Sequence, residues 1–407
     1  MKLNVIGLGY IGLPTALVFA KNGIEVIGTD YKKELVDTLN AGRLTFEEKG
    51  MDDLFKAALV NNIKFSTEYQ KADCYIVSVP TPYDKISKKL DDKYVKAAVE
   101  GILAVCEKGS IIIVESTISP GTINKSIKPL IEKRNLKIGV DVHLAHAPER
   151  IIPGNMVYEL EHNSRTIGAD SKEIGNKIAD FYGKITSGEV IVTDIKSAEM
   201  SKVVENTFRA VNIAFANELS KICRYDGMDV HEIIKICNMH PRVNILNPGP
   251  GVGGHCIPVD PWFLVGDYPT LTKVIWEALK MNESMPEYVL GRIRDVMDEH
   301  KLDDCLRVGL YGLSYKENVD DYRESPSIQI LESQNKHLGI PLKVYDPFIK
   351  NDIVQNQYHD LKQFLNDVDF VVIMVKHNEI IENMDLLKDK IILDTQNICH
   401  LKNVNRL

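Results

Sequence analysis

One pattern constrains the fold more than any other, and it occurs at both ends of the chain. Short runs of apolar and β-branched residues alternate with segments of helical periodicity near the N-terminus, and the last hundred residues repeat this order. Such alternation predicts a parallel sheet covered by helices on both faces. The expected strands are Leu3–Ile6, Val26–Thr29, Tyr75–Val79, Ile111–Glu115, Val308–Leu310, Leu342–Tyr345, Phe370–Val375 and Ile391–Leu393. We therefore predict an α/β fold with two Rossmann-like, doubly wound domains.

The region between these two segments has a helical pattern. It contains neither proline nor glycine from about residue 197 to residue 225. Its apolar residues recur at helical spacing: Val203, Val204, Phe208, Val211, Phe215, Leu219 and Ile222. A helix of this length is about 43 Å long, enough to connect two domains and to offer a surface to a second subunit. An apolar helix also suits an ordinary core.

Further helical patterns complete a central domain. They cover Val230–Cys237, Thr272–Met281 and Glu287–His300. The predicted division is a dinucleotide-binding domain over 1–194, a central helical domain over 195–301 and a second Rossmann-like domain over 302–407. A chain of 407 residues is too long for a single core, which agrees with two or three domains.

Composition and charge exclude several classes of protein. The 49 basic and 57 acidic residues give a net charge of −8, which argues against a nucleic-acid or anionic-membrane binder. No apolar stretch is long enough to span a membrane, and glycines and Pro14 interrupt the first one, unlike a signal peptide. The seven cysteines are scattered without a CxxC pair, so we expect neither disulfides nor a metal site. This pattern also favours a cytoplasmic location.

The segment from Gly7 to Gly12 reads Gly-Leu-Gly-Tyr-Ile-Gly between an expected strand and an expected helix. This context is typical of the dinucleotide fingerprint, in which glycines let the backbone approach a pyrophosphate. Asp30 follows the second strand, where a carboxylate binds ribose hydroxyls and repels a 2′-phosphate. The sequence therefore predicts NAD rather than NADP, although Lys32 and Lys33 weaken that preference.

Two further loops follow expected strands of the same sheet. They are Val79–Pro82 and Glu115–Thr122, and ligands bind at such strand ends. Their threonine hydroxyls suit contacts with the nicotinamide ribose. Ordinary turn chemistry explains either loop equally well.

The segment Gly249–Pro261 holds one thiol, Cys256, among four glycines and three prolines, with Asp260 four residues later. A nucleophile needs a rigid and uncrowded mounting of this kind. A lone cysteine in a loop is more often structural. His255 beside the thiol also suggests a redox switch, but neighbouring side chains on an extended segment point apart.

Lys202, Asn206 and Arg209 lie at positions i, i+4 and i+7 of the long helix and so share one face. Three polar residues on a face usually form a solvated stripe. A lysine and an amide beside a developing alkoxide would instead stabilise its negative charge. This set favours a reaction through a tetrahedral oxyanion.

Several motifs then occur in a characteristic order. They are GLGYIGLP, VPTP, ESTISPGT, APER (Ala147–Arg150), ENTFRAVNIAFANEL (Glu205–Leu219), GPGVGGHCIPVDP and YKENVDDYRESP (Tyr315–Pro326). Together they resemble the UDP-glucose/GDP-mannose dehydrogenase family over nearly the whole chain. HPRVNI (His240–Ile245) and VDPWFL (Val259–Leu264) look most like the branch that acts on UDP-N-acetyl-D-mannosamine.

The resemblance implies oxidation of the C6 hydroxymethyl group of a nucleotide sugar to a carboxylate, with two NAD+ consumed. It implies that Cys256 is the nucleophile, that Lys202 and Asn206 stabilise the oxyanions, and that Asp260 orients or activates water. Glu149 is similar to a second acid/base or water-orienting carboxylate, and Thr117 to a residue near the reacting carbon.

The resemblance also implies two sets of binding residues. The NAD set is Gly7, Gly9, Tyr10, Ile11, Gly12, Asp30, Thr81, Thr117 and Arg323. The UDP-sugar set is Arg150, Ile151, Lys202, Asn206, Arg209, His240, Arg242, Gly253, Tyr315 and Lys316. A homodimer through the central domain is expected, in which Arg242 reaches the site of the other subunit.

Two departures from the family pattern bear on the substrate. The segment Asp394-Thr395-Gln396 stands where many members carry a lysine or arginine. Either Lys376 or another cation takes the place of that basic residue, or UDP binds less tightly. The residues after the APER motif lack the longer acidic pattern of the UDP-glucose branch, which disfavours UDP-glucose.

The alternatives left open are the same reaction on UDP-N-acetylglucosamine or another UDP-hexose, a thiol-independent β-hydroxyacid dehydrogenase, and a non-enzymatic NAD sensor.

Overall fold

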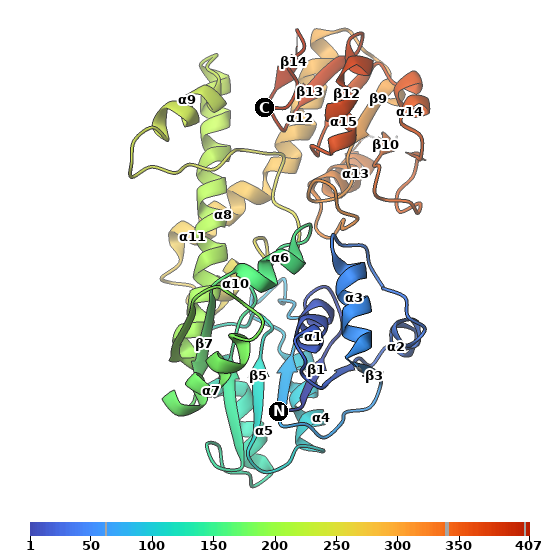
Figure 1. Ribbon diagram of the computed structural model, residues 1–407. Helices are drawn as coiled ribbons and strands as arrows, with labels where there is room; N and C mark the ends of the chain where they lie inside the picture. Colours follow the sequence, from blue (N-terminus) through green and yellow to red (C-terminus); the bar gives the residue numbers. More distant parts are fainter. Residues whose placement is uncertain (62, 338–341, 403) are drawn as a thin grey trace. The chain divides into compact units, whose positions relative to one another are not determined.

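The computed structural model describes residues 1–61, 63–337, 342–402 and 404–407 (Figure 1). The chain divides into two compact units. The first comprises Met1–Glu205 with Trp262–Tyr268, and the second Asn206–Pro261 with Pro269–Leu407. The helix α8 (Ile195–Tyr225) contributes to both units.

The first unit is built on an eight-stranded sheet with the order β3-β2-β1-β4-β5-β6-β7-β8. Its first six strands follow the order of a dinucleotide-binding fold. The strands are β1 (Leu3–Ile6), β2 (Val26–Thr29), β3 (Lys64–Ser66), β4 (Cys74–Val77), β5 (Ser110–Val114), β6 (Val142–His146), β7 (Arg165–Ala169) and β8 (Val190–Asp194). All neighbouring strands are parallel except β6 and β7, which are antiparallel.

Helices cover both faces of this sheet. They are α1 (Gly12–Lys21), α2 (Lys33–Asn40), α3 (Met51–Val60), α4 (Lys93–Leu103), the π-helix η1 (Ile123–Ile127), α5 (Lys128–Lys133), α6 (Met156–His162), α7 (Lys172–Tyr182) and α10 (Asp260–Asp267). Alternate residues of β1 belong to two different cores, with Val5 in one and Ile6 in the other. This alternation is the expected result of a sheet buried on both faces.

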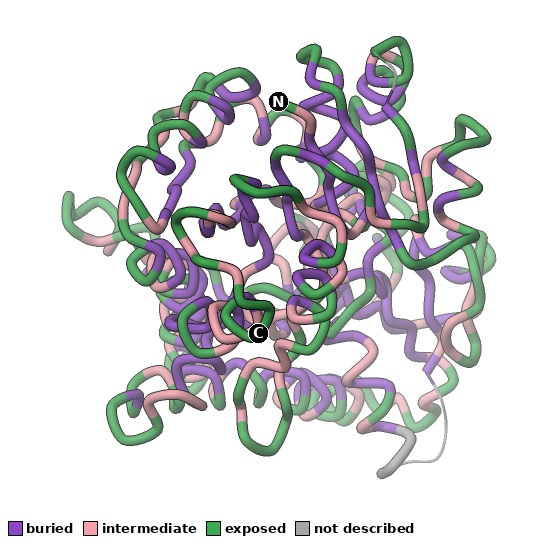
Figure 2. Tube along the Cα trace, turned by 90° about the horizontal axis from the view of Figure 1, so that it is seen from below, coloured by how far each residue is buried: buried purple, intermediate pink, exposed green. Residues whose placement is uncertain are grey.

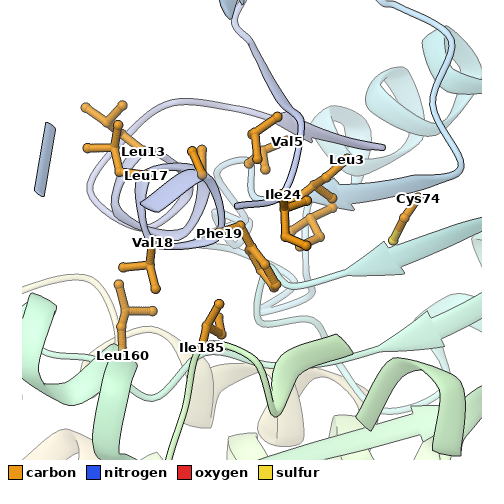
Figure 3. Close-up of a cluster of buried hydrophobic side chains, with 14 of the residues drawn as sticks. Leu3, Val5, Leu13, Leu17, Val18, Phe19, Ile24, Cys74, Leu160 and Ile185 are labelled. Atoms are coloured by element: carbon orange, nitrogen blue, oxygen red, sulfur yellow. The ribbon is translucent and has the colours of Figure 1, made fainter. Parts of the chain in front are cut away.

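Figure 3 shows the core that α1 forms with its neighbours. Val18 points towards Leu160 of α6, and Leu17, Val18 and Phe19 share one buried core with Leu3 and Val5 of β1 and with Ile185 after α7. Phe19 stacks on Phe181 with a ring-centroid distance of 4.5 Å. This packing fixes α1, and with it the preceding glycine loop, against the sheet.

The second unit contains a six-stranded, fully parallel sheet with the order β11-β10-β9-β12-β13-β14. Its strands are β9 (Val308–Tyr311), β10 (Lys343–Tyr345), β11 (Gln357–Tyr358), β12 (Phe370–Ile373), β13 (Ile391–Asp394) and β14 (Val404–Arg406). The strand order repeats that of the first six strands of the first sheet. The structure therefore confirms two Rossmann-like sheets.

The helices of the second unit are α9 (Val230–Cys237), α11 (Lys273–Glu283), α12 (Met285–Glu299), α13 (Pro326–His337), α14 (Leu361–Asp367) and α15 (Asn378–Glu382), with 3-10 turns η2 (Cys305–Arg307) and η3 (Met384–Leu387). Residues of β9 alternate between two cores, as in the first sheet. Figure 2 shows that exposed residues gather in the outer loops.

The strand predictions were accurate in place and incomplete in number. Each predicted strand is present within two residues of its expected ends. Six strands were not predicted: β3, β6, β7, β8, β11 and β14. The physical reasons are visible in their residues, because β7 begins with a buried arginine, β6 contains two histidines, and β8 is a partly exposed edge strand.

The long central helix is confirmed and is two residues longer at its start than predicted. Asp194 ends β8 and accepts hydrogen bonds from the backbone N–H and the hydroxyl of Ser197, at 3.0 and 2.5 Å. These bonds lower the pKa of Asp194 and cap the helix. The domain boundaries at 194 and 301 stay a prediction, since the compact units divide the chain elsewhere.

Candidate active site

The loop between β1 and α1 requires glycine at two positions. Gly7 has a φ of +90°, and a Cβ atom there would lie 2.3 Å from the carbonyl oxygen of Ser78. A Cβ atom on Gly12 would lie 1.9 Å from the carbonyl oxygen of Gly7. Gly9 differs, because its Cβ position has no atom within 4 Å. The loop is thus closed on the protein side and open at Gly9, as phosphate binding at the start of α1 requires.

Asp30 is fixed beside this loop. Its Oδ2 accepts a hydrogen bond from the N–H of Leu8 at 2.9 Å, and its Oδ1 accepts one from the N–H of Lys32 at 2.9 Å. The carboxylate is buried, yet each oxygen has a further lone pair for a ribose hydroxyl. Tyr10 packs on Phe46 across the same loop, at a ring-centroid distance of 4.5 Å. These residues fit a bound NAD.

The two predicted strand-end loops are joined to each other. The hydroxyl of Ser116 accepts a hydrogen bond from the N–H of Val79 and donates one to its carbonyl oxygen, both at 2.8 Å. Thr81 and Thr117 are half-buried in these loops. The sequence identified the loops from their position after strands, and the structure adds the hydrogen bonds that hold them together.

A buried glutamate on α8 shapes the second of these loops. Glu199 accepts hydrogen bonds from the backbone N–H groups of Gly121 and Ile123, the latter at 2.9 Å. It is fully buried, and this burial raises its pKa. Sequence reasoning missed Glu199, because its spacing from the loop in the chain gives no signal of the contact.

The APER motif forms a dense set of internal contacts. Arg150 makes a two-point ion pair with Glu205 of α8 and also donates to the carbonyl oxygen of Ser164 and the hydroxyl of Thr166. Each guanidinium nitrogen thus has a protein acceptor, so Arg150 ties this segment to α8. Its predicted substrate contact stays a prediction.

Glu149 is buried and holds the backbone that follows it. Its Oε1 accepts hydrogen bonds from the N–H groups of Arg150 and Ile151, at 2.7 and 3.2 Å. Its Oε2 lies 2.7 Å from the guanidinium of Arg165 on β7. Ile151 is buried as well. Sequence analysis missed Arg165, although a charged residue at the start of an apolar run is an available signal.

On α8 the structure separates the three predicted polar residues. Lys202 and Asn206 are buried, whereas Arg209 is exposed. The amide of Asn206 donates a hydrogen bond to the carboxylate of Asp260 at 2.6 Å. Two residues predicted to act in the reaction, 54 positions apart in the chain, are thereby brought into direct contact.

Cys256 and Asp260 belong to one turn. The carbonyl oxygen of Cys256 accepts hydrogen bonds from the N–H groups of Val259 and Asp260, at 3.1 and 2.9 Å, and α10 begins at Asp260. Cys256 is exposed and Asp260 is buried. The turn therefore presents the thiol outward and directs the carboxylate to Asn206.

His255 does not supply a cation to the neighbouring thiol at neutral pH. Desolvation and the guanidinium of Arg323 lower the pKa of His255 to about 4. The imidazole is therefore neutral at pH 7. This disfavours the redox-switch hypothesis, which needed a protonated histidine to activate Cys256.

The glycines of the thiol loop allow close contact with the segment after β9. The N–H of Gly254 donates to the carbonyl oxygen of Arg323 at 2.9 Å. A Cβ atom on Gly253 would lie 2.5 Å from the Cβ of Tyr315. Arg323 makes a two-point ion pair with the buried Asp321, at 2.8 and 2.5 Å. Gly253 is thus needed for packing, and its predicted substrate contact stays a prediction.

Replacing Gly253 with alanine is expected to destabilise the second unit, because the Cβ of Tyr315 cannot move without its backbone. Overpacking of this kind costs about 1–3 kcal/mol. The matched control is Gly249→Ala, since that position has no atom within 4 Å of an added Cβ. Thermal melting followed by circular dichroism should show a lower transition temperature for Gly253→Ala only; equal melting of both variants would contradict the packing argument.

The first loop of the second sheet repeats that of the first sheet. Gly312 has a φ of +101°, and its N–H donates to the carbonyl oxygen of Tyr345 at 2.8 Å. The N–H of Leu313 then donates to Asp346 at 2.6 Å. Asp346 also faces His377 at 3.3 Å, and both side chains are fully buried. The imidazole covers the carboxylate, so this loop differs from a dinucleotide site.

The structure gives Gln396 an internal partner. Its side-chain amide donates to the carbonyl oxygen of Met374 at 2.8 Å, which joins the ends of β12 and β13. Which cation replaces the basic residue that many family members carry at this position stays open. Lys376 is exposed and Lys316 half-buried after the ends of β12 and β9, where a cation would face a ligand.

His240 and Arg242 lie together in an exposed turn, where the N–H of Arg242 donates to His240 Nδ1 at 3.3 Å.

Within the part of the chain that the structure describes, no group of three or more histidine, cysteine or acidic residues is arranged to hold a metal ion. No described helix combines the length and apolar character needed to cross a membrane.

An exposed apolar stripe runs along α8. It consists of Val204, Phe208, Phe215 and Ile222, which are 46%, 64%, 52% and 48% exposed. The opposite face is buried, with Val203 and Ala210 fully covered. The helical periodicity seen in the sequence therefore contains two apolar faces, of which one packs within the chain.

Three family profiles match the chain in sequence order. They are the UDP-glucose/GDP-mannose dehydrogenase family NAD binding domain over residues 1–186, the central domain over residues 196–284 and the UDP binding domain over residues 309–401. Each sheet described above lies largely within one of the outer matches.

The chain is also similar to named proteins over its whole length. It is 41% identical to a UDP-N-acetyl-D-mannosamine dehydrogenase from Methanococcus vannielii, over 98% of this chain and 93% of that protein. It is 39% identical to an NDP-N-acetyl-D-galactosaminuronic acid dehydrogenase from Ralstonia nicotianae, over 99% and 97%. The native structure of the UDP-N-acetyl-mannosamine dehydrogenase Cap5O from Staphylococcus aureus matches with a TM-score of 0.89 at 40% identity, over 100% of this chain and 97% of that one.

Proposed function

Because the chain belongs to the UDP-glucose/GDP-mannose dehydrogenase family, we propose that it oxidises the C6 hydroxymethyl group of UDP-N-acetyl-D-mannosamine to a carboxylate. It is an NAD-dependent nucleotide-sugar dehydrogenase. The names of its relatives support an N-acetylhexosamine as the sugar. The observation that carries the mechanism is the turn in which an exposed Cys256 precedes Asp260, whose carboxylate is held by Asn206.

When bound, NAD would supply the hydride acceptor for each of two oxidation steps. In the first step a base takes the proton of the hydroxyl group, a hydride leaves C6, and an aldehyde forms. The sulfur of Cys256 then adds to the aldehyde carbon, which forms a C–S bond and turns the carbonyl oxygen into an alkoxide. Lys202 and Asn206 stabilise this alkoxide by charge and by hydrogen bonding. Its collapse re-forms the C=O bond, expels the second hydride and leaves a thioester.

Hydrolysis completes the reaction. Water adds to the thioester carbon and gives up a proton, the C–S bond breaks, and the thiolate of Cys256 is released with the acid product. Asp260 suits the role of proton acceptor for this water, and Glu149 that of a second carboxylate, which orients the water. Asn206 has two N–H groups, so one holds Asp260 while the other remains for the substrate oxygen.

The nucleotide portions of both ligands are proposed to bind at the ends of parallel strands. For NAD we propose Gly7, Gly9, Tyr10, Ile11, Gly12, Asp30, Thr81, Thr117 and Arg323. For the UDP-sugar we propose Arg150, Ile151, Lys202, Asn206, Arg209, His240, Arg242, Gly253, Tyr315 and Lys316. The open space at Gly9 and the fixed carboxylate of Asp30 support the NAD set. The scattered free cysteines support a cytoplasmic location.

The function is tested with purified protein, NAD+ and a panel of UDP-sugars. We expect two NADH per sugar from UDP-N-acetyl-D-mannosamine, and a lower kcat/KM with NADP+ because Asp30 repels a 2′-phosphate. The second candidate is UDP-N-acetyl-D-galactosamine, favoured by the relative named for N-acetylgalactosaminuronic acid. UDP-N-acetylglucosamine and UDP-glucose complete the panel. One NADH per sugar would instead indicate a thiol-independent alcohol dehydrogenase.

We further propose a homodimer in which the apolar stripe of α8 is covered by a second copy. The stripe comprises four large apolar residues, each at least 46% exposed, on one face of a 31-residue helix. Arg242 would then approach the site of the other subunit.

Replacing Phe208 and Phe215 together with aspartate is expected to convert the dimer to a monomer, because the interface would bury two unpaired charges. Light scattering should give twice the chain mass for the wild type and one chain mass for the variant. The control is Val60→Asp on α3, where an exposed apolar residue lies away from the stripe. A monomeric wild-type protein would reject the proposal.

A further inference from the structure

Glu149 belongs to a buried cluster of charges in the first unit. Arg165 Nη1 lies 2.7 Å from Glu149 Oε2 and 3.9 Å from Glu115 Oε1. The three side chains are at most 5% exposed. Two ionised carboxylates beside one guanidinium would leave an uncompensated negative charge in a desolvated place, which is costly. A proton on one carboxyl group removes this charge.

The contacts indicate which carboxyl group holds the proton. Glu149 lies 2.7 Å from the guanidinium of Arg165 and accepts two backbone hydrogen bonds, so donors and a cation surround its carboxyl group. Glu115 is 3.9 Å from Arg165, and among the described residues its carboxyl group accepts long hydrogen bonds from neutral hydroxyls, those of Thr15 at 3.3 Å and Tyr182 at 3.4 Å. Burial and the charge of Glu149 raise the pKa of Glu115 to about 8. Glu115 is therefore protonated at neutral pH.

We propose that Arg165 and Glu115 are positioning residues for Glu149, in which Arg165 holds the Glu149 carboxylate in place and Glu115 keeps the proton of the cluster. This inference rests on the proposed function, in which Glu149 orients the water that opens the thioester. Loss of the proton from Glu115 would give Arg165 a second anion to bind. The hold on Glu149 would then weaken.

The other titratable groups of the cluster do not supply this proton. Tyr182 on α7 packs against Arg165, whose guanidinium carbon lies 4.9 Å from the ring centroid. Burial raises the pKa of Tyr182 well above its ordinary value and raises that of Cys74, on β4, to about 12. Both groups therefore stay neutral below pH 10, and Glu115 is the group that titrates near pH 8.

The inference predicts a specific pH dependence. As the pH rises through 8, Glu115 ionises and thioester hydrolysis in the wild type slows. Glu115→Gln has no proton to lose there and keeps its rate. The stability of the folded state should also fall as the pH rises. Because the pKa of Glu115 is raised, the folded state binds more protons than the unfolded state between about pH 4.5 and 8, and stability decreases across this window. Glu115→Gln should lose less stability over that range.

The experiment follows one turnover of UDP-N-acetyl-D-mannosamine with excess NAD+ between pH 6.5 and 9.5. NADH is read by absorbance, and the acyl group on Cys256 is read by intact-protein mass after quenching. We expect the acyl fraction of the wild type to rise several-fold above pH 8 and that of Glu115→Gln to stay constant. Arg165→Gln should accumulate acyl-enzyme about tenfold at pH 7, with Arg165→Lys restoring part of the hydrolysis.

The outcomes separate this inference from the function on which it rests. If the wild type makes no NADH from any UDP-N-acetylhexosamine, the proposed function fails. If the wild type makes two NADH per sugar while Glu115→Gln shows the same alkaline rise in acyl-enzyme, the positioning role is overturned. Should Arg165→Gln not fold, the comparison of wild type with Glu115→Gln still decides.

Discussion

Cys256→Ser is expected to lose acid formation by at least about 10³-fold, because removal of a covalent nucleophile blocks every later step. The first oxidation does not need the sulfur, so one hydride per sugar can still be transferred. The reaction should therefore stop at the aldehyde level, with at most one NADH per sugar. The measurement is the ratio of NADH, by absorbance, to acid product, by ion-exchange chromatography.

A matched control separates this effect from a general loss of a thiol. Cys237→Ser changes a half-buried cysteine of α9, outside the thiol loop. This variant should keep two NADH per sugar. A Cys256→Ser enzyme that still released acid at the wild-type rate would rule out the covalent path and return the thiol-independent mechanism to consideration.

Lys202→Ala and Asn206→Ala are each expected to lower kcat by about 10²–10³-fold and to change KM much less. Both side chains are proposed to stabilise the alkoxide, which exists only after the substrate is bound. Their removal should therefore slow the chemical steps, and so lower kcat, more than it weakens substrate binding. Asn206→Ala also removes the hydrogen bond to the buried Asp260 and should therefore destabilise the protein.

Lys196→Ala is the control for the lysine, since Lys196 lies on the same helix and is exposed. Its kcat should match that of the wild type. Steady-state kinetics with UDP-N-acetyl-D-mannosamine and a melting curve for each variant make the test. A Lys202→Ala enzyme with unchanged kcat and a raised KM would assign Lys202 to ground-state binding instead of oxyanion stabilisation.

Several local features of the chain could be predicted from the sequence. The glycine positions of the first loop follow from backbone geometry, since only glycine allows a φ of +90° and the close contact of Gly12 with Gly7. The long helix follows from apolar spacing and the absence of breakers. The exposed Cys256 follows from a segment so rich in glycine and proline that it forms no regular structure before α10.

Other expectations needed the tertiary structure. Arg150 was expected to contact the substrate, and its guanidinium also binds Glu205, while Gln396, a departure from the family pattern, donates to the carbonyl oxygen of Met374. Their residue types suit phosphates, but a guanidinium or an amide binds a carboxylate or a carbonyl oxygen equally well. Which acceptor is near depends on residues far away in the chain, such as Glu205 and Met374, so residue type alone does not decide the partner.

By itself, the sequence determined the two sheets, the connecting helix and the chemical character of the thiol loop, because these depend on periodicity and on the backbone freedom of nearby residues. Only the tertiary structure decided that Asn206 meets Asp260 and that Glu149 shares a buried cation with Glu115. Burial and the charge of a neighbour set the ionisation of a carboxyl group, and both come from residues that the fold brings together across long stretches of chain.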